Sequence, residues 1–219
     1  MTARRVQGHL VVSAGPTREY VDPVRFLSNV SSGRMGFEIA AAAARSGWRV
    51  TLVAGPGALA TPPGVERVDV VSAREMLTAL RRAFAGADAL VMAAAVADWR
   101  PVRRLAGKWR AKDGGRSATE LALVRNPDIL ATLARRKGRR TVVGFALETG
   151  AGLRRARAKL ERKNADYIVL NDDSALNQGS ATVTILAKDG TVERHERRAK
   201  REIARRIVRL LASHVDSRA

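Results

Sequence analysis

The feature that most constrains the fold is a regular alternation of short apolar runs with amphipathic segments. Apolar runs of strand length occupy 9–15, 48–56, 67–72, 87–99, 140–150 and 166–172. Segments with helical spacing of apolar residues occupy 37–47, 72–86, 126–138, 151–165 and 199–215. Strands that alternate with helices favour a parallel sheet with right-handed crossovers. We therefore predict an α/β fold, a Rossmann-like parallel sheet flanked by helices.

Local signals predict where several of these elements begin or end. Ser72 and Glu75 have the spacing of a capping box, so a helix should begin after Ser72. Asn126 followed by Pro127 predicts a second helix start, with Asn126 as the N-cap. The segment 181–196 alternates in polarity and breaks at Asp189-Gly190, which indicates a C-terminal antiparallel β-hairpin. We expect one domain over 1–219, with the hairpin as an appendage around 180–197.

Composition excludes several kinds of chemistry. The 219 residues contain no cysteine, which removes disulfides, thiolate metal sites and a cysteine nucleophile together. The three histidines, His9, His195 and His214, lie away from the loops that follow the strands, so a Ser-His-Asp triad or a histidine metal site is disfavoured. A site of cations, amides and backbone N–H groups remains, and such a site suits phosphoryl or nucleotidyl transfer.

The formal charge of +19 raises the alternative of a nucleic-acid-binding domain. The 40 basic residues are dispersed over several predicted helices, however, and only seven of them are lysine. No aromatic-rich strand offers a stacking surface for bases. We expect anionic small-molecule substrates and no nucleic acid. No apolar run reaches the ~18 residues that a membrane span needs, so we expect a cytoplasmic protein without membrane contact.

The loop after the first strand has the features of an anion site. Its small polar residues lie just before a helix N-terminus, where free N–H groups and the helix dipole favour negative charge. These residues are Gly15, Ser31, Ser32 and Gly33. The alternative is a tight turn with serine caps. Arg25 and Asn29 favour the functional interpretation, because a guanidinium and an amide suit a carboxylate or an acyl oxygen.

Further candidates follow the middle strand. Ala94 and Ala95 are small enough for a planar ring to lie against the strand end, and Asp98 follows them. Asp98 suits a base, a ribose or a metal ion, although a turn carboxylate explains it equally simply. Lys108 lies in a glycine-containing stretch, as a mobile phosphate-binding lysine should, but a solvated lysine has the same appearance.

Lys159 and Lys163 lie four residues apart on a predicted helix, so both point to one face. In a chain with 33 arginines and seven lysines, this pair suits a triphosphate. The alternative is a solvated helix face.

A dinucleotide-dependent oxidoreductase of the NAD(P) type is the competing enzyme class. The first strand is not followed by G-x-G-x-x-G, and neither tyrosine has a lysine four residues later. Both absences weigh against that class.

Taken together, the motifs resemble a known family. The segments GPTREYVDPVRFLSNVSSGRMG, AAAVADWRP, NPDIL, VGFALET, KLERKNADYIVLND and NQGSATVTIL follow in the order found in phosphopantothenate–cysteine ligases, also called phosphopantothenoylcysteine synthetases. The resemblance covers nearly the whole chain. Two details depart from the family: KWRAK replaces the common K-I-K-K, and FALET replaces FAAET.

The resemblance implies a reaction in coenzyme A biosynthesis. 4′-Phosphopantothenate and L-cysteine would be joined through an acyl-nucleotide, with release of pyrophosphate and a nucleoside monophosphate. CTP is the co-substrate in most bacterial members, ATP is the alternative, and Mg²⁺ or Mn²⁺ accompanies the nucleotide. Family members are homodimers, and we expect the hairpin edge at the interface. Many are fused to a flavin-dependent decarboxylase, so the chain is either a stand-alone ligase or the ligase domain of such a protein.

The resemblance also implies roles for particular residues. Asn29 falls where an asparagine handles the acyl intermediate, Arg25 where an arginine assists, and Lys108 where a mobile lysine serves catalysis, with Lys112 as the alternative lysine. The expected nucleotide-binding residues are Gly15, Ser31, Ser32, Gly33, Ala94, Ala95, Asp98, Lys108, Asn126, Pro127, Asp128, Ile129, Phe145, Lys159 and Lys163. The metal-coordinating residues remain unassigned.

Overall fold

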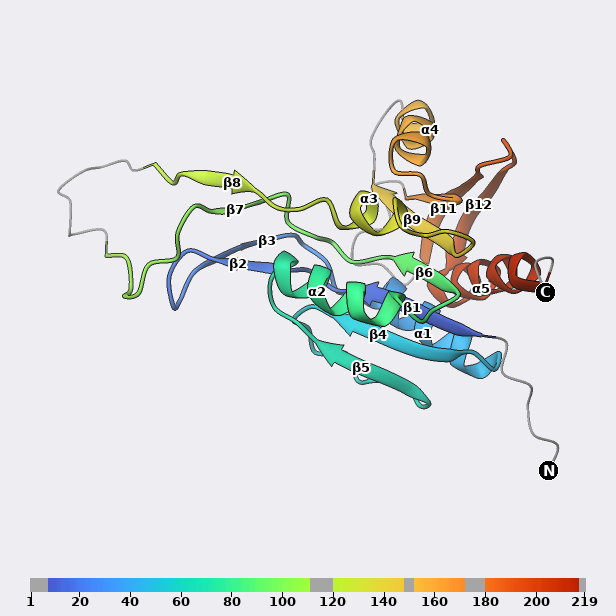
Figure 1. Cartoon of the computed structure of the whole chain (residues 1–219), viewed down its shortest axis with the longest axis horizontal. Coiled ribbons are helices and arrows are strands. Elements are labelled where there is room, and N and C mark those ends of the chain that lie inside the picture. Colours follow the sequence, from blue (N-terminus) through green and yellow to red (C-terminus); the bar gives the residue numbers. More distant parts are fainter. Residues whose placement is uncertain (1–7, 111–119, 148–151, 172–179, 217–219) are drawn as a thin grey trace.

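The computed structural model describes residues 8–110, 120–147, 152–171 and 180–216 (Figure 1). Its main sheet has eight strands: β1 (His9–Ala14), β4 (Arg49–Ala54), β5 (Val65–Asp69), β6 (Ala89–Met92), β9 (Thr141–Leu147), β10 (Tyr167–Asn171), β11 (Ser180–Ala187) and β12 (Val192–Ala199). Their order is β12-β11-β10-β9-β6-β1-β4-β5. Neighbours from β5 to β10 are parallel, whereas β10, β11 and β12 pair antiparallel. The predicted α/β class is confirmed, and the C-terminal hairpin extends the main sheet.

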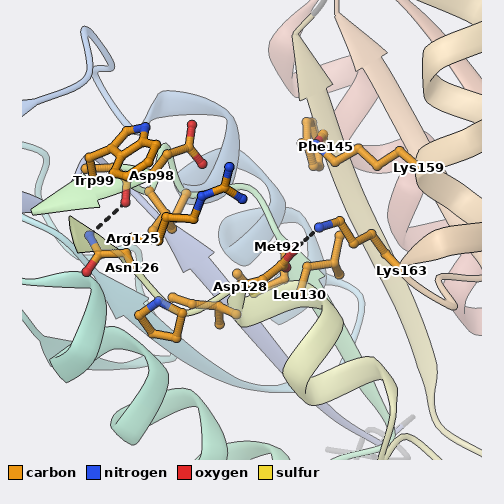
Figure 2. Close-up of a pocket in the computed structure, with 15 residues that line it drawn as sticks. Met92, Asp98, Trp99, Arg125, Asn126, Asp128, Leu130, Phe145, Lys159 and Lys163 are labelled. Atoms are coloured by element: carbon orange, nitrogen blue, oxygen red, sulfur yellow. Dashed lines mark hydrogen bonds and ion pairs between the residues drawn. The ribbon is translucent and has the colours of Figure 1, made fainter. Parts of the chain in front are cut away.

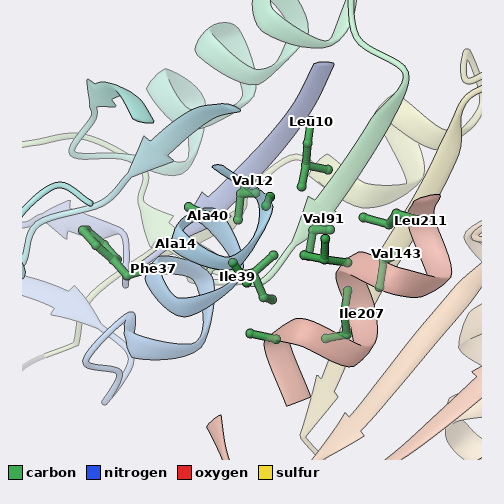
Figure 3. Close-up of a cluster of buried hydrophobic side chains, with 14 of the residues drawn as sticks. Leu10, Val12, Ala14, Phe37, Ile39, Ala40, Val91, Val143, Ile207 and Leu211 are labelled. Carbon is green, nitrogen blue, oxygen red and sulfur yellow. The ribbon is translucent and has the colours of Figure 1, made fainter. Parts of the chain in front are cut away.

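Helices cover both faces of this sheet. One face carries α1 (Arg34–Arg45) and α5 (Lys200–Asp216), and the other carries α2 (Ala73–Phe84), α3 (Ile129–Ala134) and α4 (Gly152–Arg162). Figure 3 shows the first face, where Ile39 of α1 and Ile207 of α5 belong to one buried cluster with Val12 of β1. The opposite core contains Leu80 of α2 and Leu160 of α4.

The sequence pattern of β1 follows from this three-layer arrangement. Leu10, Val12 and Ala14 join the core under α1 and α5, while Val11 joins the opposite core. Successive side chains of a strand point to opposite faces, so a strand covered on both faces must be apolar throughout. The continuous apolar run that predicted a buried strand is therefore explained.

The predicted helix starts had different outcomes. Ser72 caps α2, and its hydroxyl accepts a hydrogen bond from the Glu75 N–H at 3.3 Å, as predicted. The prediction for Asn126 is wrong, because α3 begins at Ile129 and Asp128 is its N-cap. Asp128 Oδ1 accepts from the Ala131 N–H at 3.0 Å. The Asn126 side chain instead donates to the Ala97 carbonyl at 2.8 Å, which removes it from the helix start.

Two short ribbons project from the body, and the sequence did not predict them. One pairs β2 (Arg18–Tyr20) with β3 (Phe26–Ser28), and the other pairs β7 (Trp99–Pro101) with β8 (Leu123–Arg125). We call the described residues 18–28, 99–110 and 120–125 the arm; the two ribbons extend together on one side of the sheet (Figure 1). Strands of three residues carry too little periodicity to be recognised.

One buried carboxylate fastens the arm. Asp22 is fully buried and accepts hydrogen bonds from the N–H groups of Val24 and Arg25, both at 2.7 Å, and of Trp109 at 3.0 Å. Trp109 belongs to the loop after β7, so Asp22 joins the two ribbons. Among the residues that the structure describes, no helix is both long and apolar enough to cross a membrane.

Candidate active site

The parallel strands end at one edge of the sheet, and this edge carries the candidate site. The connection from β1 leads to β4 on one side of β1, whereas β6 lies on its other side. Such a reversal of strand order opens a crevice beyond the carboxyl ends of the strands. Two adjoining cavities lie there, lined in part by the loops after β1 and β6 and by the carboxyl ends of β9 and β10.

The first cavity has a volume of about 450 Å³ and opens between α3, α4 and the β6 end (Figure 2). Its lining includes most of the predicted nucleotide-binding residues: Ala94, Asp98, Asn126, Pro127, Asp128, Ile129, Phe145, Lys159 and Lys163. Residues that lie far apart in the sequence thus meet around one space. We call this space the nucleotide cavity.

Lys159 and Lys163 reach into the nucleotide cavity from the C-terminal end of α4 (Figure 2). The prediction that they share one face is confirmed. Lys159 Nζ donates to the Phe145 carbonyl at 2.8 Å, and Lys163 Nζ forms an ion pair with Asp128. Burial lowers the pKa of Lys163, an effect that the charge of Asp98 partly offsets. Two ammonium groups are therefore held in place across from Asp98 and Asn126.

The second cavity adjoins the first and has a volume of about 600 Å³. It is lined by the loop before α1, the β6 end, the β9 end, Asn171 at the end of β10 and Lys200 at the start of α5. The two cavities share Ala94, Val96, Asp98, Phe145 and Lys159. Because one wall serves both, a group in one cavity lies next to a group in the other. We call the second space the acyl cavity.

Asn29 joins the loop after β1 to the loop after β6. Its Nδ2 group donates to the carbonyl of Val96 at 3.0 Å and to that of Ala95 at 3.3 Å. Thr17 reinforces this junction, since its hydroxyl accepts from the Ala97 N–H at 3.0 Å. Asn29 also lines the acyl cavity, so the predicted catalytic amide lies beside the shared wall.

The small polar residues before α1 have two kinds of role. Ser31, Ser32 and Gly33 line the acyl cavity, and the two serine hydroxyls also accept hydrogen bonds from the N–H groups of Gly33 and Arg34. Gly15 lines neither cavity. It lies buried beneath the loop, where a Cβ at Gly33 would stand 2.9 Å from the Gly15 nitrogen. Gly33 therefore permits a close backbone approach to Gly15, and a Cβ at Gly15 would stand 3.1 Å from the Gly55 carbonyl oxygen.

Arg25 and Lys108 lie outside both cavities. Arg25 bonds to the Asp22 carboxylate and donates to the Trp109 carbonyl, and Lys108 is the exposed residue just before Trp109. The structure thus brings these two candidates together on the arm, away from Asn29. Lys112, the alternative lysine, lies outside the described residues.

Several lining residues were missed from the sequence, and the polar ones in the second cavity include Arg34, Asn171 and Lys200. Asn171 lies at the end of the run 166–172, which was predicted as a strand without a site residue. Lys200 is one of several cations in the basic run RRAKREIARR, and there a solvated helix is the ordinary interpretation. Its one distinguishing signal is its identity as a lysine in a chain that prefers arginine.

The described residues contain no group of three or more His, Cys, Asp or Glu side chains suited to hold a metal ion. Asp98 is the carboxylate that lines both cavities and is exposed, whereas Asp128 is paired with Lys163. Mg²⁺ characteristically binds one or two carboxylates together with substrate phosphates and water. The residues present therefore fit a Mg²⁺ ion that arrives with a nucleotide.

Comparisons with known proteins agree with this fold. The coenzyme A biosynthesis bifunctional protein CoaBC of Vibrio parahaemolyticus is 44% identical over 186 residues, which are 83% of this chain and 46% of that protein. The crystal structure of the C-terminal domain of a CoaBC protein is 38% identical, with a TM-score of 0.84, and covers 98% of this chain and 100% of that one. A Cab2 variant in complex with phosphopantothenate-cysteine shares the fold at 17% identity, with a TM-score of 0.79 and coverage of 97% and 88%.

The chain spans about half the length of the Vibrio relative. A family model described as the DNA/pantothenate metabolism flavoprotein C-terminal domain matches residues 6–215, which is almost all of the chain. The resemblance inferred from the motifs is confirmed at the level of the family. The chain therefore belongs to the family of the DNA/pantothenate metabolism flavoprotein C-terminal domain.

Proposed function

We propose that the chain is a ligase that joins 4′-phosphopantothenate to L-cysteine through an acyl-nucleotide. The observation that carries this proposal is the wall shared by the two cavities, formed by Ala94, Val96, Asp98, Phe145 and Lys159. A nucleotide in one cavity and an acid in the other would meet at this wall. That arrangement suits the reaction of a carboxylate with an α-phosphate, because two bound reactants are held as neighbours.

The proposed first step is nucleotidyl transfer. A carboxylate oxygen of the acid attacks the α-phosphorus, a new phosphorus–oxygen bond forms, and the bond to the β-phosphate breaks to release pyrophosphate. Lys159 and Lys163 line the nucleotide cavity and would neutralise negative charge on a triphosphate bound there. Neither lysine has to act as a nucleophile, since the nucleotide itself activates the acid.

The proposed second step forms the amide. The cysteine amine attacks the acyl carbon, a carbon–nitrogen bond forms, and the bond to the nucleoside monophosphate breaks. We assign Asn29 to the acyl group, because its amide lies at the acyl cavity and is fixed by the Ala95 and Val96 carbonyls. A fixed amide dipole orients an acyl phosphate without reorganising during the reaction. Lys108 and Arg25 are proposed to act from the arm.

We propose Mg²⁺, or Mn²⁺, as the accompanying ion, with Asp98 as the protein carboxylate near it. When bound, the ion would supply charge neutralisation at the phosphates. CTP is the proposed nucleotide, with ATP as the alternative. A flavin-dependent decarboxylase is the proposed partner, either as a fused domain or as a separate protein.

A pyrophosphate-release assay tests the proposal. The chain is incubated with 4′-phosphopantothenate, cysteine and Mg²⁺, with CTP and ATP in parallel reactions. Pyrophosphate release that requires the acid, followed by amide formation that requires cysteine, is the expected result. Absence of pyrophosphate with both nucleotides would refute the ligase, and faster release with ATP would reverse the nucleotide assignment.

We also propose a homodimer, with the arm as its contact surface. Exposed apolar side chains gather on the arm, including Phe26, Trp99, Val102, Leu123 and Val124. By contrast, the outer strand β12 has the sequence VERHERRA, whose charges discourage edge-to-edge pairing. The hairpin edge expected from the sequence is thus the less suitable surface.

A further inference from the structure

Lys200 is a buried cation that the proposed reaction has so far left without a role. It is the first residue of α5, only 7% of its surface is exposed, and it lines the acyl cavity. The preceding residue, Ala199, is the last of β12, so the strand passes into the helix without a loop. This junction fixes the position of Lys200. Its burial keeps this charged side chain at the cavity wall and away from bulk solvent.

The surroundings of Lys200 concentrate positive potential at one end of the acyl cavity. Arg34, which also lines this cavity, is the first residue of α1, and α1 packs against α5. Two cations therefore line the same space; α1 has no acidic residue in its first turn and no side-chain cap, whereas α5 has Glu202 in its first turn. Positive side chains at helix N-termini are unfavourable unless an anion is present. Burial and then the charge of Arg34 lower the pKa of Lys200, in agreement with this crowding.

The position of Lys200 separates it from the triphosphate. Lys163 lines the nucleotide cavity alone, Lys159 lines both cavities, and Lys200 lines the acyl cavity alone. The lysines thus mark successive parts of one combined space. A triphosphate beside Lys159 and Lys163 leaves Lys200 and Arg34 available for a second anion at the other end.

We propose that Lys200, assisted by Arg34, binds the phosphomonoester of the acyl substrate and so selects a phosphorylated acid over the same acid without phosphate. This inference rests on the proposed function, because that function supplies an acid with a phosphate at its far end. A phosphomonoester carries nearly two negative charges at neutral pH and accepts several charge-assisted hydrogen bonds. It therefore matches a site of two cations beside the N-terminus of α1, which has no side-chain cap.

Asn171 adds an independent sign that the cavity wall receives a ligand. Its Oδ1 atom is buried and accepts no hydrogen bond from the described residues, although it belongs to the lining. Buried acceptors nearly always have a donor. The middle of the acyl substrate carries amide N–H and hydroxyl donors, which suit this oxygen.

The experiment compares Lys200→Met with Arg201→Met, which removes a neighbouring cation whose side chain is exposed and outside the cavity lining. Initial rates are measured with 4′-phosphopantothenate, with pantothenate and with CTP as the varied substrate. In Lys200→Met we expect the KM for 4′-phosphopantothenate to rise about tenfold or more, with the KM for CTP and the rate with pantothenate unchanged. Arg201→Met should retain the wild-type preference for the phosphorylated acid.

A KM for 4′-phosphopantothenate within about twofold of wild type would overturn the inference. So would an equal rise in the KM values for both substrates, since that pattern marks a structural role. If Lys200→Met fails to fold, Arg34→Met provides the second variant, because Arg34 is exposed and its replacement should not disturb the core. The KM of Arg34→Met for the phosphorylated acid should also rise. An unchanged KM would overturn the inference.

Calorimetric titration of 4′-phosphopantothenate and of pantothenate, without nucleotide, separates this inference from the proposed function. Wild-type protein should bind the phosphorylated acid more tightly, and Lys200→Met should lose this difference. If no nucleotide supports pyrophosphate release, the ligase proposal fails alone while the titration still decides the role of Lys200. Equal binding of both acids by the wild type overturns the inference even if turnover is normal.

Discussion

The ammonium of Lys163 is paired with the carboxylate of Asp128, the residue that caps the N-terminus of α3 (Figure 2). One carboxylate therefore performs two tasks, since Oδ1 caps the helix and Oδ2 holds the lysine. The Lys163 side chain is 15% exposed, and burial lowers its pKa. The ion pair holds the Lys163 ammonium at the nucleotide cavity, where a triphosphate would compete with Asp128 for this ammonium.

Replacing Lys163 by Met should raise the KM for the nucleotide about tenfold or more, because one charge-assisted contact to the triphosphate is lost. Arg162→Met is the matched control, because it removes a neighbouring cation whose side chain is exposed and outside the lining of both cavities. We expect its nucleotide KM to stay within about threefold of wild type. Equal increases in both variants would show that the nucleotide KM responds to net charge and not to the position of Lys163.

Asn29→Ala should uncouple the two proposed steps. The Asn29 amide is fixed by the Ala95 and Val96 carbonyls beside the acyl cavity, and its loss should leave the acyl group poorly oriented. We expect pyrophosphate release to continue while amide formation falls, with acyl-nucleotide detected by chromatography. Ser28→Ala removes a hydrogen bond to the Thr17 carbonyl in the same loop, and Ser28 is not part of the cavity lining. In Ser28→Ala, pyrophosphate and the amide should form in the same ratio as in the wild type. Amide formation at the wild-type rate in Asn29→Ala would remove Asn29 from the mechanism.

Gly33→Ala and Gly64→Ala separate backbone strain from steric overlap. Both glycines have a φ of 74°, a left-handed conformation that costs an alanine about 1–2 kcal/mol. A Cβ at Gly64 would meet only the Ala44 Cβ at 3.9 Å, whereas a Cβ at Gly33 would lie 2.9 Å from the Gly15 nitrogen. Gly33→Ala should therefore lose about 1–3 kcal/mol more free energy of unfolding than Gly64→Ala. Urea denaturation measures both, and equal losses would mean that the loop before α1 relaxes freely.

The stability that Asp22 gives to the arm should be lost at acid pH. Burial alone would raise the pKa of this carboxyl, but hydrogen bonds from Val24, Arg25 and Trp109 outweigh it, so the pKa lies below its usual value. A carboxyl with a lowered pKa in the folded protein stabilises it fully above the unfolded pKa of about 4, and the stabilisation is lost as pH falls through the folded value. Asp22→Asn should have a lower Tm near neutral pH.

The gap in Tm between the wild type and Asp22→Asn should narrow as the pH is lowered from about 5 to about 2. Calorimetry across this range provides the measurement. A Tm difference that does not change with pH would show that the charge of Asp22 does not contribute to stability. The same variant should also lower turnover if Lys108 acts from the loop that Asp22 holds through Trp109.

Leu123→Glu and Val192→Glu distinguish the two surfaces considered for the homodimer. Leu123 lies on the arm and is 41% exposed, while Val192 lies at the start of β12 and is 43% exposed. A carboxylate buried against an apolar partner surface is strongly unfavourable. We expect Leu123→Glu to be monomeric in analytical ultracentrifugation and Val192→Glu to remain dimeric. The opposite result would place the contact on the hairpin.

The sequence predicted the elements whose stability is local or whose burial is complete. β1 was recognisable because both its faces are covered, and α2 because Ser72 and Glu75 cap it. The strands of the arm were not recognisable, since strands of three residues have no clear period, and β3 and β8 are exposed or half-buried throughout. Asn126 was misassigned because two polar residues precede α3, and only the tertiary bond to Ala97 decides between them.

Residues of the candidate site were predicted where a sequence motif implied them, and were missed where only tertiary packing brings them to the cavities. Lys159 and Lys163 were predicted from their spacing on a helix, and the structure places both in the nucleotide cavity. Lys200 enters the acyl cavity because β12 passes directly into α5, which no local pattern indicates. Arg25 and Lys108 match the family motifs, yet in this structure they lie on the arm and outside both cavities.

The hydrogen bonds from Asn29 and Thr17 to the segment after β6 have a thermodynamic consequence. The segments that carry Asn29 and Thr17 are both bonded to one stretch of backbone, Ala95–Ala97, so we expect their motions to be coupled. A nucleotide that ordered this stretch would also order the loop proposed to receive the acid, and the second ligand would then lose less conformational entropy on binding. Cooperative binding of the two substrates therefore needs no visible change of shape, only a shared loss of motion.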